Sequence, residues 1–223
     1  MRLCMFHPND NPLERGWVGR IEDDRMLHLA AQTLQSFFLV GGGSRVHAEY
    51  PLDDVTLLVP VQHPPTVRLF DDDGSFRFAN ATAVVGPDVA VAGTGLSARA
   101  RIAVVIGAGG EIGGTTAMVE WYDPVEQLDV KRSDFGIVLG PVVVTPDETG
   151  GGTFACRLRA GERVVEGARG AFAWAEALAL AGHRTTLRPG DVIAGPSIAV
   201  LDGVGEDVLL EVDGIGTLAC PLR

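Results

Sequence analysis

The sequence RARIAVVIGAGGEIGG, residues 99–114, is followed directly by TTAMVEWY, residues 115–122, and this stretch decides the fold class. An apolar run that leads into glycines is also found in dinucleotide-binding loops, which need G-x-G-x-x-G and then a helix. Gly107 and Gly109 fit that pattern, but Ile112 occupies the third glycine position. The β-branched and aromatic residues that follow favour a strand. The stretch therefore predicts two strands joined by a glycine turn, and it argues against nucleotide binding.

The composition excludes several classes of protein. The chain has 223 residues, of which 46% are hydrophobic, and a formal net charge of −11. The acidic pI of about 4.8 argues against a nucleic-acid partner, because phosphates repel such a surface. The apolar runs are shorter than the roughly 18 residues that a membrane span needs. The first residues do not resemble a secretory signal, so we expect a cytoplasmic protein without a membrane partner.

Cysteine and lysine usage add two expectations. Cys4, Cys156 and Cys220 are far apart and form no CxxC pair, which favours three buried thiols in a reducing compartment. Of the 18 basic residues, only Lys131 is lysine, an excess of arginine that is typical of a GC-rich genome. A lysine retained in such a chain marks a candidate functional position, because the pKa of lysine can be lowered whereas guanidinium stays charged.

The pattern along the chain predicts two domains. Residues 1–58 form a small α+β domain, with short strands and an amphipathic helix over 27–40 that stops at the glycines 41–43. Residues 59–223 contain many short β-runs separated by Gly, Pro and Asp, and a single clear helix over 170–183. Residues 145–152, TPDETGGG, have the composition of a hairpin tip. Many strands and few helices predict a mainly β, α+β protein with a barrel or rolled sheet.

Several segments resemble the fumarylacetoacetate hydrolase family. LRPGDVIAGP (187–196) and LLEVDGIGTLACPL (209–222) are similar to its C-terminal end, and KRSDFGIVLGPVVVT (131–145) is similar to its lysine, aspartate-phenylalanine and leucine-glycine-proline pattern. RIAVVIG (101–107) is similar to the strand that carries two of its metal ligands. The resemblance spans nearly the whole chain. It implies a mixed β-roll behind a small N-terminal domain, and a homodimer.

The chain departs from this family where the family binds its metal. The resemblance implies a Glu-x-Glu pair and an aspartate that hold a divalent cation, but Arg99 and Arg101 stand at the Glu-x-Glu positions and only Asp123 matches the third ligand. The segment 66–87 also lacks the histidine–glutamate pair with which the family activates water. We therefore expect no metal, no other cofactor and no typical metal-dependent C–C hydrolysis, because hard cations need oxygen anions.

The residues that are left suggest a metal-independent site. Arg99 and Arg101 are two apart on a strand, so their side chains share a face, and the resemblance places Asp123 and Lys131 in the same cavity. We predict Lys131, Asp123 and Arg101 as catalytic residues, and Arg99, Tyr122 and Trp121 as substrate-binding residues. Two guanidiniums can hold a carboxylate or enolate and stabilise developing negative charge, and nearby cations lower the pKa of Lys131.

Such a site fits an anionic, enolisable β-dicarbonyl or polyketide-like acid. The candidate reactions are those of an isomerase, a lyase (elimination or decarboxylation) or a cyclase. A GC-rich genome together with a repurposed pocket suggests a role in secondary metabolism. Two alternatives stay open. The arginines can form structural ion pairs with Asp123 and other acids in an inactive pseudoenzyme that acts as a subunit partner or scaffold. The pocket can also bind an acid without chemistry, and Trp121 and Tyr122 can be core residues.

Overall fold

The computed structural model describes residues 1–223 except 88, 150–152 and 170–171. The described residues form a mainly β structure, as the sequence predicts, with two sheets and few helices. The strands are β1 (Arg2–Pro8), β2 (Trp17–Glu22), β3 (Arg25–Leu29), β4 (Val46–Pro51), β5 (Val55–Leu58), β6 (Val67–Phe70), β7 (Phe76–Ala79), β8 (Val84–Val85), β9 (Leu96–Ile106), β10 (Ile112–Tyr122), β11 (Ile137–Leu139), β12 (Val142–Val144), β13 (Phe154–Ala160), β14 (Arg163–Arg169), β15 (Val192–Ala194), β16 (Ala199–Val204), β17 (Val208–Val212) and β18 (Gly216–Cys220). The α-helices are α1 (Leu34–Leu39), α2 (Pro146–Thr149) and α3 (Trp174–Ala181).

The hairpin of β9 and β10 is the centre of the structure. These two 11-residue strands pair in antiparallel fashion. The Gly107 N–H donates to the Glu111 carbonyl across the turn at 2.7 Å. Gly109 has a φ of 67°, which is accessible to glycine at low cost. The predicted glycine turn between two strands is therefore confirmed, and no helix follows the glycines as a dinucleotide-binding loop would require.

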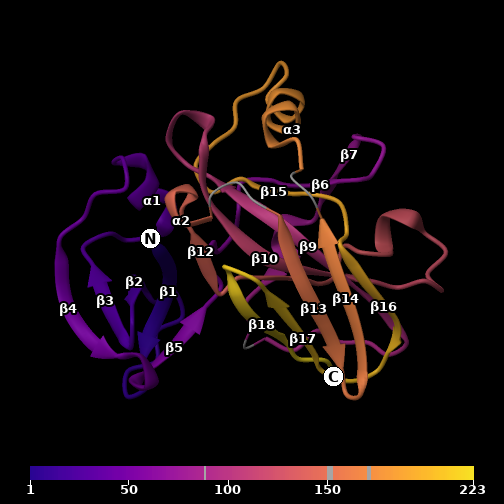
Figure 1. Ribbon diagram of the computed structural model, residues 1–223, viewed down its shortest axis with the longest axis horizontal. Coiled ribbons are helices and arrows are strands. Elements are labelled where there is room, and N and C mark those ends of the chain that lie inside the picture. Colours follow the sequence, from indigo (N-terminus) through magenta and orange to yellow (C-terminus); the bar gives the residue numbers. More distant parts are fainter. Residues whose placement is uncertain (88, 150–152, 170–171) are drawn as a thin grey trace.

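The large sheet extends from this hairpin in both directions. Its order in the described residues is β4-β3-β2-β1-β12-β10-β9-β15-β6-β7, with β5, β8, β11 and β16 paired at its sides. The boundary predicted near residue 59 lies between β5 and β6. Strand β1 nevertheless pairs with β12, so the N-terminal strands continue the sheet of the larger part. Figure 1 shows the N-terminal strands, in indigo and purple, on one side of the hairpin.

The first predicted helix is shorter than expected. Residues 27–29 belong to β3, which pairs with β2 and β4, so only Leu34–Leu39 are helical. Thr33 caps this helix, because its side chain accepts from the Ser36 N–H and the Ser36 hydroxyl accepts from the Thr33 N–H. The second predicted helix is confirmed as α3, which ends at Gly182, although residues 170–171 lie outside the described residues.

The loop predicted over 145–152 contains a short helix. Helix α2 spans Pro146–Thr149, and residues 150–152 of the predicted hairpin tip lie outside the described residues. Within the described part of the chain, no helix is long and apolar enough to cross a membrane. The three cysteines are buried and form no disulfide with one another, as predicted.

A second sheet covers one face of the central hairpin. Its order in the described residues is β14-β13-β17-β18, and Figure 1 shows these strands, in orange and yellow, in front of β9 and β10. The core between the sheets includes Trp121 of β10, Leu158 of β13 and Leu210 of β17, all fully buried. Trp121 thus lies in the core, which is the alternative left open for this residue, and is not a pocket wall. The other face of the hairpin is left for the site described below.

We expect Trp121→Ala to lower the free energy of unfolding by about 3–5 kcal/mol, because truncating a large buried aromatic side chain leaves a cavity. Urea unfolding followed by circular dichroism measures this loss. Trp121→Phe keeps most of the apolar volume and serves as the control with a smaller loss. A loss below about 1 kcal/mol for the alanine variant would contradict the position of Trp121 between the sheets.

Candidate functional site

The site begins with the alternation of side chains on the central hairpin. Arg99 is directly opposite Glu120, and Arg101 is opposite Met118, so Arg99, Arg101, Glu120 and Tyr122 lie on one face of β9 and β10. This face is opposite to the one that packs on the second sheet. The expectation that the two arginines share a face is therefore correct.

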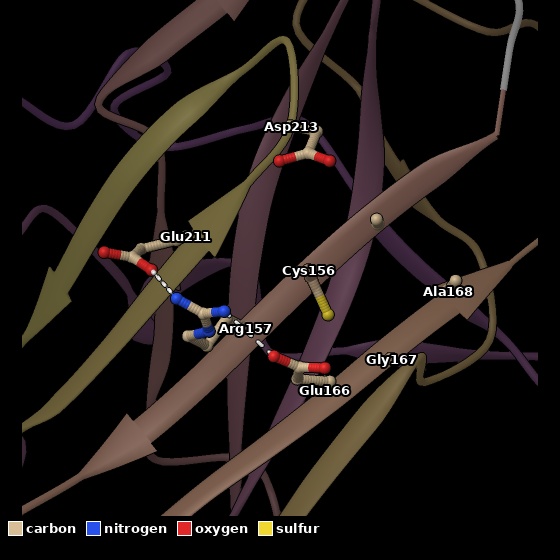
Figure 2. A pocket seen from close by; sticks show the side chains of 8 residues that line it. Cys156, Arg157, Glu166, Gly167, Ala168, Glu211 and Asp213 are labelled. Atoms are coloured by element: carbon tan, nitrogen blue, oxygen red, sulfur yellow. Dashed lines mark hydrogen bonds and ion pairs between the residues drawn. The ribbon is translucent and has the colours of Figure 1, made fainter.

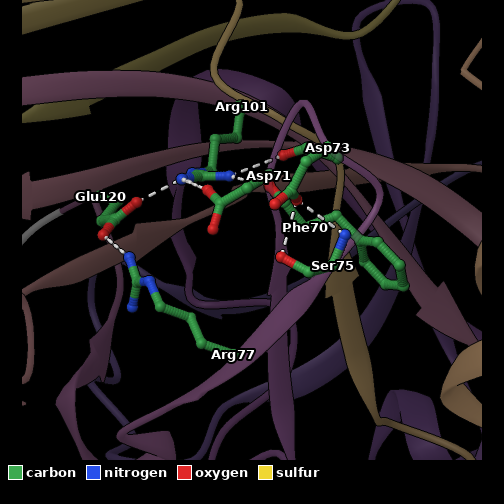
Figure 3. A network of polar contacts seen from close by, with 8 residues as sticks. Phe70, Asp71, Asp73, Ser75, Arg77, Arg101 and Glu120 are labelled. Atoms are coloured by element: carbon green, nitrogen blue, oxygen red, sulfur yellow. Dashed lines mark hydrogen bonds and ion pairs between the residues drawn. The ribbon is translucent and has the colours of Figure 1, made fainter.

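Arg101 is held inside the protein. Its side chain is only 2% exposed, and its Nε donates to Glu120 Oε2 at 2.8 Å. Its Nη1 donates to the carbonyl oxygens of Phe70 and Gly195 at 2.8 and 2.9 Å. Its Nη2 lies 3.8 Å from Asp71 Oδ1. Burial lowers the pKa of Arg101, and Glu120 opposes this effect. Figure 3 shows Glu120, Phe70 and Asp71 around the guanidinium. Most of its N–H donors therefore have acceptors within the protein.

Glu120 links this buried arginine to a second one. Its side chain is fully buried, and its Oε1 pairs with the guanidinium of Arg77 from β7. Figure 3 shows the carboxylate between Arg101 and Arg77. Burial alone would raise the pKa of Glu120, but the charges of Arg101 and Arg77 outweigh it and hold this pKa below its usual value. Glu120 is thus a buried carboxylate that is shared by two guanidiniums.

Arg99 has a different environment. Its guanidinium carbon lies 3.7 Å from the centroid of the Tyr122 ring, a cation–π contact. Arg132 donates a 2.9 Å hydrogen bond to the Tyr122 hydroxyl and thereby helps to fix the ring. Arg99 forms no ion pair with any of the residues that the structure describes. Its charge helps to lower the pKa of Glu120 opposite it, but no carboxylate of the described residues pairs with its guanidinium, whose N–H donors a ligand can use.

Arg99 and Tyr122 line a pocket of about 430 Å³. The same pocket is lined by Arg77 and Asn80 from the region of β7, by Asp71, and by residues of the segment 129–134. Pockets of this size are typical of sites for small molecules. Two cationic side chains, an aromatic ring and several polar groups therefore meet in one hollow, next to the buried pair of Arg101 and Glu120.

The structure does not bring Asp123 and Lys131 into this pocket lining. Asp123 lies just after β10, where its Oδ1 accepts from the Val125 N–H at 2.9 Å and stabilises a turn. Lys131 is 55% exposed and its amino group lies 2.5 Å from Asp134 Oδ2. Asp134 itself lines the pocket, so Lys131 is at its outer edge. Of the six residues predicted from the sequence, Arg99 and Tyr122 line the pocket and Arg101 lies directly beneath it.

The residues at the positions where the resemblance implies metal ligands do not fit a divalent cation. Two of the three positions carry the guanidiniums of Arg99 and Arg101, and the third, Asp123, caps a turn. Among the described residues, no group of three or more His, Cys, Asp or Glu side chains could hold a metal ion. The buried carboxylate of Glu120 already pairs with Arg101 and Arg77. A hard cation would meet positive charge here in place of oxygen anions.

A second hollow lies on the smaller sheet and is less suited to chemistry (Figure 2). Arg157 lies there between Glu166 and Glu211, at 2.9 and 3.9 Å, so these charges satisfy one another. Burial raises the pKa of the neighbouring Cys156 thiol, which disfavours the thiolate that a nucleophile needs. The pocket beside Arg99 is therefore the better candidate site.

The sequence prediction missed Glu120, Arg77 and Asp71. Glu120 had a detectable signal, because a glutamate in a strand of otherwise apolar and aromatic residues requires a buried cation as partner, and two arginines stand on the preceding strand. Arg77 and Asp71 had no such signal. They come from β7 and from the turn before it, and their approach to β9 and β10 depends on the order of strands in the sheet.

Comparison with known proteins identifies the fold. No protein-family model and no curated protein matches the sequence. Solved structures match it over 100% of its length. They include maleylpyruvate hydrolase from Sphingobium sp. SYK-6 in complex with manganese(II) ion and pyruvate (20% identity, TM-score 0.79, 98% of that chain), 5-carboxymethyl-2-hydroxymuconate delta-isomerase from Mycobacterium smegmatis (22%, 0.79, 99%) and 2-keto-3-deoxyarabinonate dehydratase (16%, 0.78, 99%).

We expect Glu120→Gln to destabilise the protein by about 3–5 kcal/mol, because it leaves the buried guanidinium of Arg101 without a counter-charge. Urea unfolding at pH 7 measures the difference. Glu111→Gln is a matched control, because Glu111 is exposed in the turn between β9 and β10. Equal stability of the two variants would contradict the role of Glu120 as the buried counter-ion.

The contribution of Glu120 should also depend on pH. Its pKa is lowered in the folded state, so its stabilisation is complete above its unfolded pKa of about 4.3 and is lost as the pH falls through the lower, folded value. The stability difference between the wild type and Glu120→Gln should therefore be constant from pH 7 to about pH 5 and shrink below that. A difference that grows on acidification would show the opposite sign of the pKa shift.

Proposed function

We infer that this chain, which has the fold of the fumarylacetoacetate hydrolase family, is a metal-independent enzyme acting on a small enolisable carboxylic acid. The observation that carries this proposal is the environment of Arg99. Its guanidinium lies 3.7 Å from the Tyr122 ring in the wall of a 430 Å³ pocket and has no ion-pair partner among the described residues. A half-buried cation without a partner is favourable where a ligand supplies the anion.

The arrangement supports chemistry through an enolate. A carboxylate or β-dicarbonyl group bound between Arg99 and Arg77 would meet fixed positive charge on two sides. Such preorganised charge stabilises the negative oxygen that develops when a carbon acid loses a proton. Isomerisation, elimination, decarboxylation and cyclisation of β-dicarbonyl acids all use this stabilisation. The solved structures of similar fold are hydrolases, isomerases and dehydratases by name, which supports a small acidic substrate.

Lys131, Asp123 and Arg101 keep distinct proposed roles. Arg101 contributes its charge from beneath the pocket, since its Nε and Nη1 are bonded to Glu120 and to two carbonyls and its Nη2 lies 3.8 Å from Asp71 Oδ1. Lys131 lies at the outer edge, where it pairs with Asp134, and it could transfer a proton only if that pair opened. Asp123 would have to leave the turn that it caps. We propose these two as acid–base groups of a rearranged pocket.

One observation favours the alternative of a pseudoenzyme. Arg101, at a position where the resemblance implies a metal ligand, is buried and held by Glu120, which is the arrangement expected of a retired active site. In that case the protein would serve as a subunit partner or scaffold, and the pocket beside Arg99 would bind no acid. We also propose a cytoplasmic homodimer, which the family resemblance and the three unpaired buried cysteines support.

We expect Arg99→Met to weaken the binding of oxalate, a small planar dianion that resembles an enolate, at least tenfold, because charge-assisted hydrogen bonds contribute about 1.5–3 kcal/mol. Isothermal titration calorimetry with excess EDTA measures the affinity. Arg25→Met is the control, because Arg25 is exposed and pairs with Glu49 in the N-terminal strands.

Three outcomes of this titration are informative. Binding in EDTA that is lost only in Arg99→Met supports a metal-independent acid site. Binding that requires added magnesium or manganese would contradict metal independence. No binding of oxalate, together with no turnover of β-dicarbonyl acids, would favour the pseudoenzyme.

A further inference from the structure

We propose that Asp71 is the proton acceptor of this site and removes a proton from the carbon next to the carbonyl group of a bound β-dicarbonyl acid. The inference rests on the proposed function. In the pocket as the structure has it, Asp71 takes the proton transfer that Lys131 and Asp123 could take on only after a rearrangement. This gives the two halves of the pocket different tasks, because the arginines would hold the anion while the carboxylate on the β6–β7 turn would move the proton.

The turn between β6 and β7 fixes the position of Asp71. The Asp71 N–H donates to the Ser75 carbonyl at 2.9 Å, and the Gly74 N–H donates to the Asp71 carbonyl at 3.1 Å. Asp73 accepts from both the N–H and the hydroxyl of Ser75, at 2.9 and 2.7 Å (Figure 3). These bonds use the backbone of Asp71 and the side chains of its neighbours. The Asp71 carboxylate is therefore placed by the turn and is not needed to form it.

The side chain of Asp71 is accessible to a ligand in the pocket. It is 53% exposed and lines the same pocket as Arg99 and Arg77. Its closest cation in the structure is Arg101, whose Nη2 lies 3.8 Å from Oδ1, too far for a hydrogen bond. Arg101 already has Glu120 as its close partner. The Asp71 carboxylate therefore lines the pocket without a close ion-pair partner among the described residues, next to the charges of Arg99 and Arg77.

The other carboxylates around the pocket have closer partners. Asp134 lies 2.5 Å from the amino group of Lys131, and Asp129 lies 3.4 Å from the Nε of Arg132. Glu120 is fully buried between Arg101 and Arg77, where protonation would leave two guanidiniums without a counter-charge. Among the described residues that line the pocket, Asp71 is therefore the carboxylate best placed to accept a proton from a ligand.

The step balances without a cofactor. The Asp71 carboxylate takes one proton from the carbon between two carbonyl groups. The electron pair of that C–H bond forms the C=C bond of the enolate, and the former C=O pair moves onto oxygen, where Arg99 and Arg77 stabilise it. In D2O the carboxyl proton exchanges with solvent, and return of a deuteron gives the starting acid with one C–D bond.

The test is exchange of the α-protons of acetoacetate, acetylpyruvate and 3-oxooctanoate in D2O, followed by proton NMR in EDTA, together with the affinity for oxalate. The variants are Asp71→Asn, Arg99→Met and Lys131→Met, and Asp72→Asn is the control for the same chemical change in the same turn. We expect Asp71→Asn to slow enzyme-dependent exchange at least 100-fold, as removal of a general base does, and to bind oxalate as well as the wild type or more tightly. Asp72→Asn should exchange like the wild type.

The outcomes separate this inference from the proposed function. Wild-type exchange that persists in Asp71→Asn would overturn the role of Asp71 and leave the proposed function standing, and its loss in Lys131→Met would then assign the proton to Lys131. Loss of oxalate binding in Asp71→Asn would assign Asp71 to the binding or structure of the pocket. Wild-type protein that neither binds oxalate nor exchanges any of the three acids would overturn both proposals.

Discussion

The carboxylate of Glu120 is completely shielded from solvent, and the centre of the protein is arranged around its charge. Removing an ion from water costs several kcal/mol, so such a group persists only where cations and hydrogen bonds compensate it. Arg101 from β9 and Arg77 from β7 supply the charge, and the Phe70 and Gly195 carbonyls accept from Nη1 of Arg101. Residues at the ends of β6 and β15 therefore converge with β7, β9 and β10 on one ionic centre, beside which the pocket is formed.

This centre depends on a one-residue irregularity in the β9–β10 hairpin. The register shifts between the pairs of Ile112 and Gly114, so that Glu120 faces Arg99. Without the extra residue, Glu120 would point to the face that carries Trp121 and would enter the apolar core between the sheets, because a slip of one residue exchanges the two faces of a strand. Gly114 lies close to β12, where an added Cβ would meet Val143 Cγ1 at 2.5 Å. Thus the sequence that resembles a phosphate-binding loop acts by setting strand register.

The sequence predicted the parts of this structure that local patterns and family motifs determine. The glycine turn, the strands around it, α3 and the overall fold were all predicted. Helix α1 was overextended because the helical spacing of residues 27–40 competes with the pairing of β3 to two strands. The placement of Lys131 and Asp123 could not be derived, because it is set by the path of the segment 123–136. Glu120 could have been predicted, because it is a charged residue among apolar and aromatic neighbours in its strand. Arg77 and Asp71 could be predicted only from the order of strands in the sheet.

An arginine recognises a ligand in a different way from a metal ion. A metal ion offers open coordination positions, whereas a buried guanidinium has a fixed set of N–H donors. Arg101 directs Nε and Nη1 to Glu120 and to two carbonyls, and its Nη2 lies near Asp71, so it retains a charge but has few free donors for a ligand. Arg99, stacked on Tyr122, and the solvent-facing side of Arg77 lie nearer to the pocket. Under the proposed function, the anion is therefore recognised at the pocket wall and not at the buried position where the resemblance implies a metal. The group that transfers the proton is expected on the same wall.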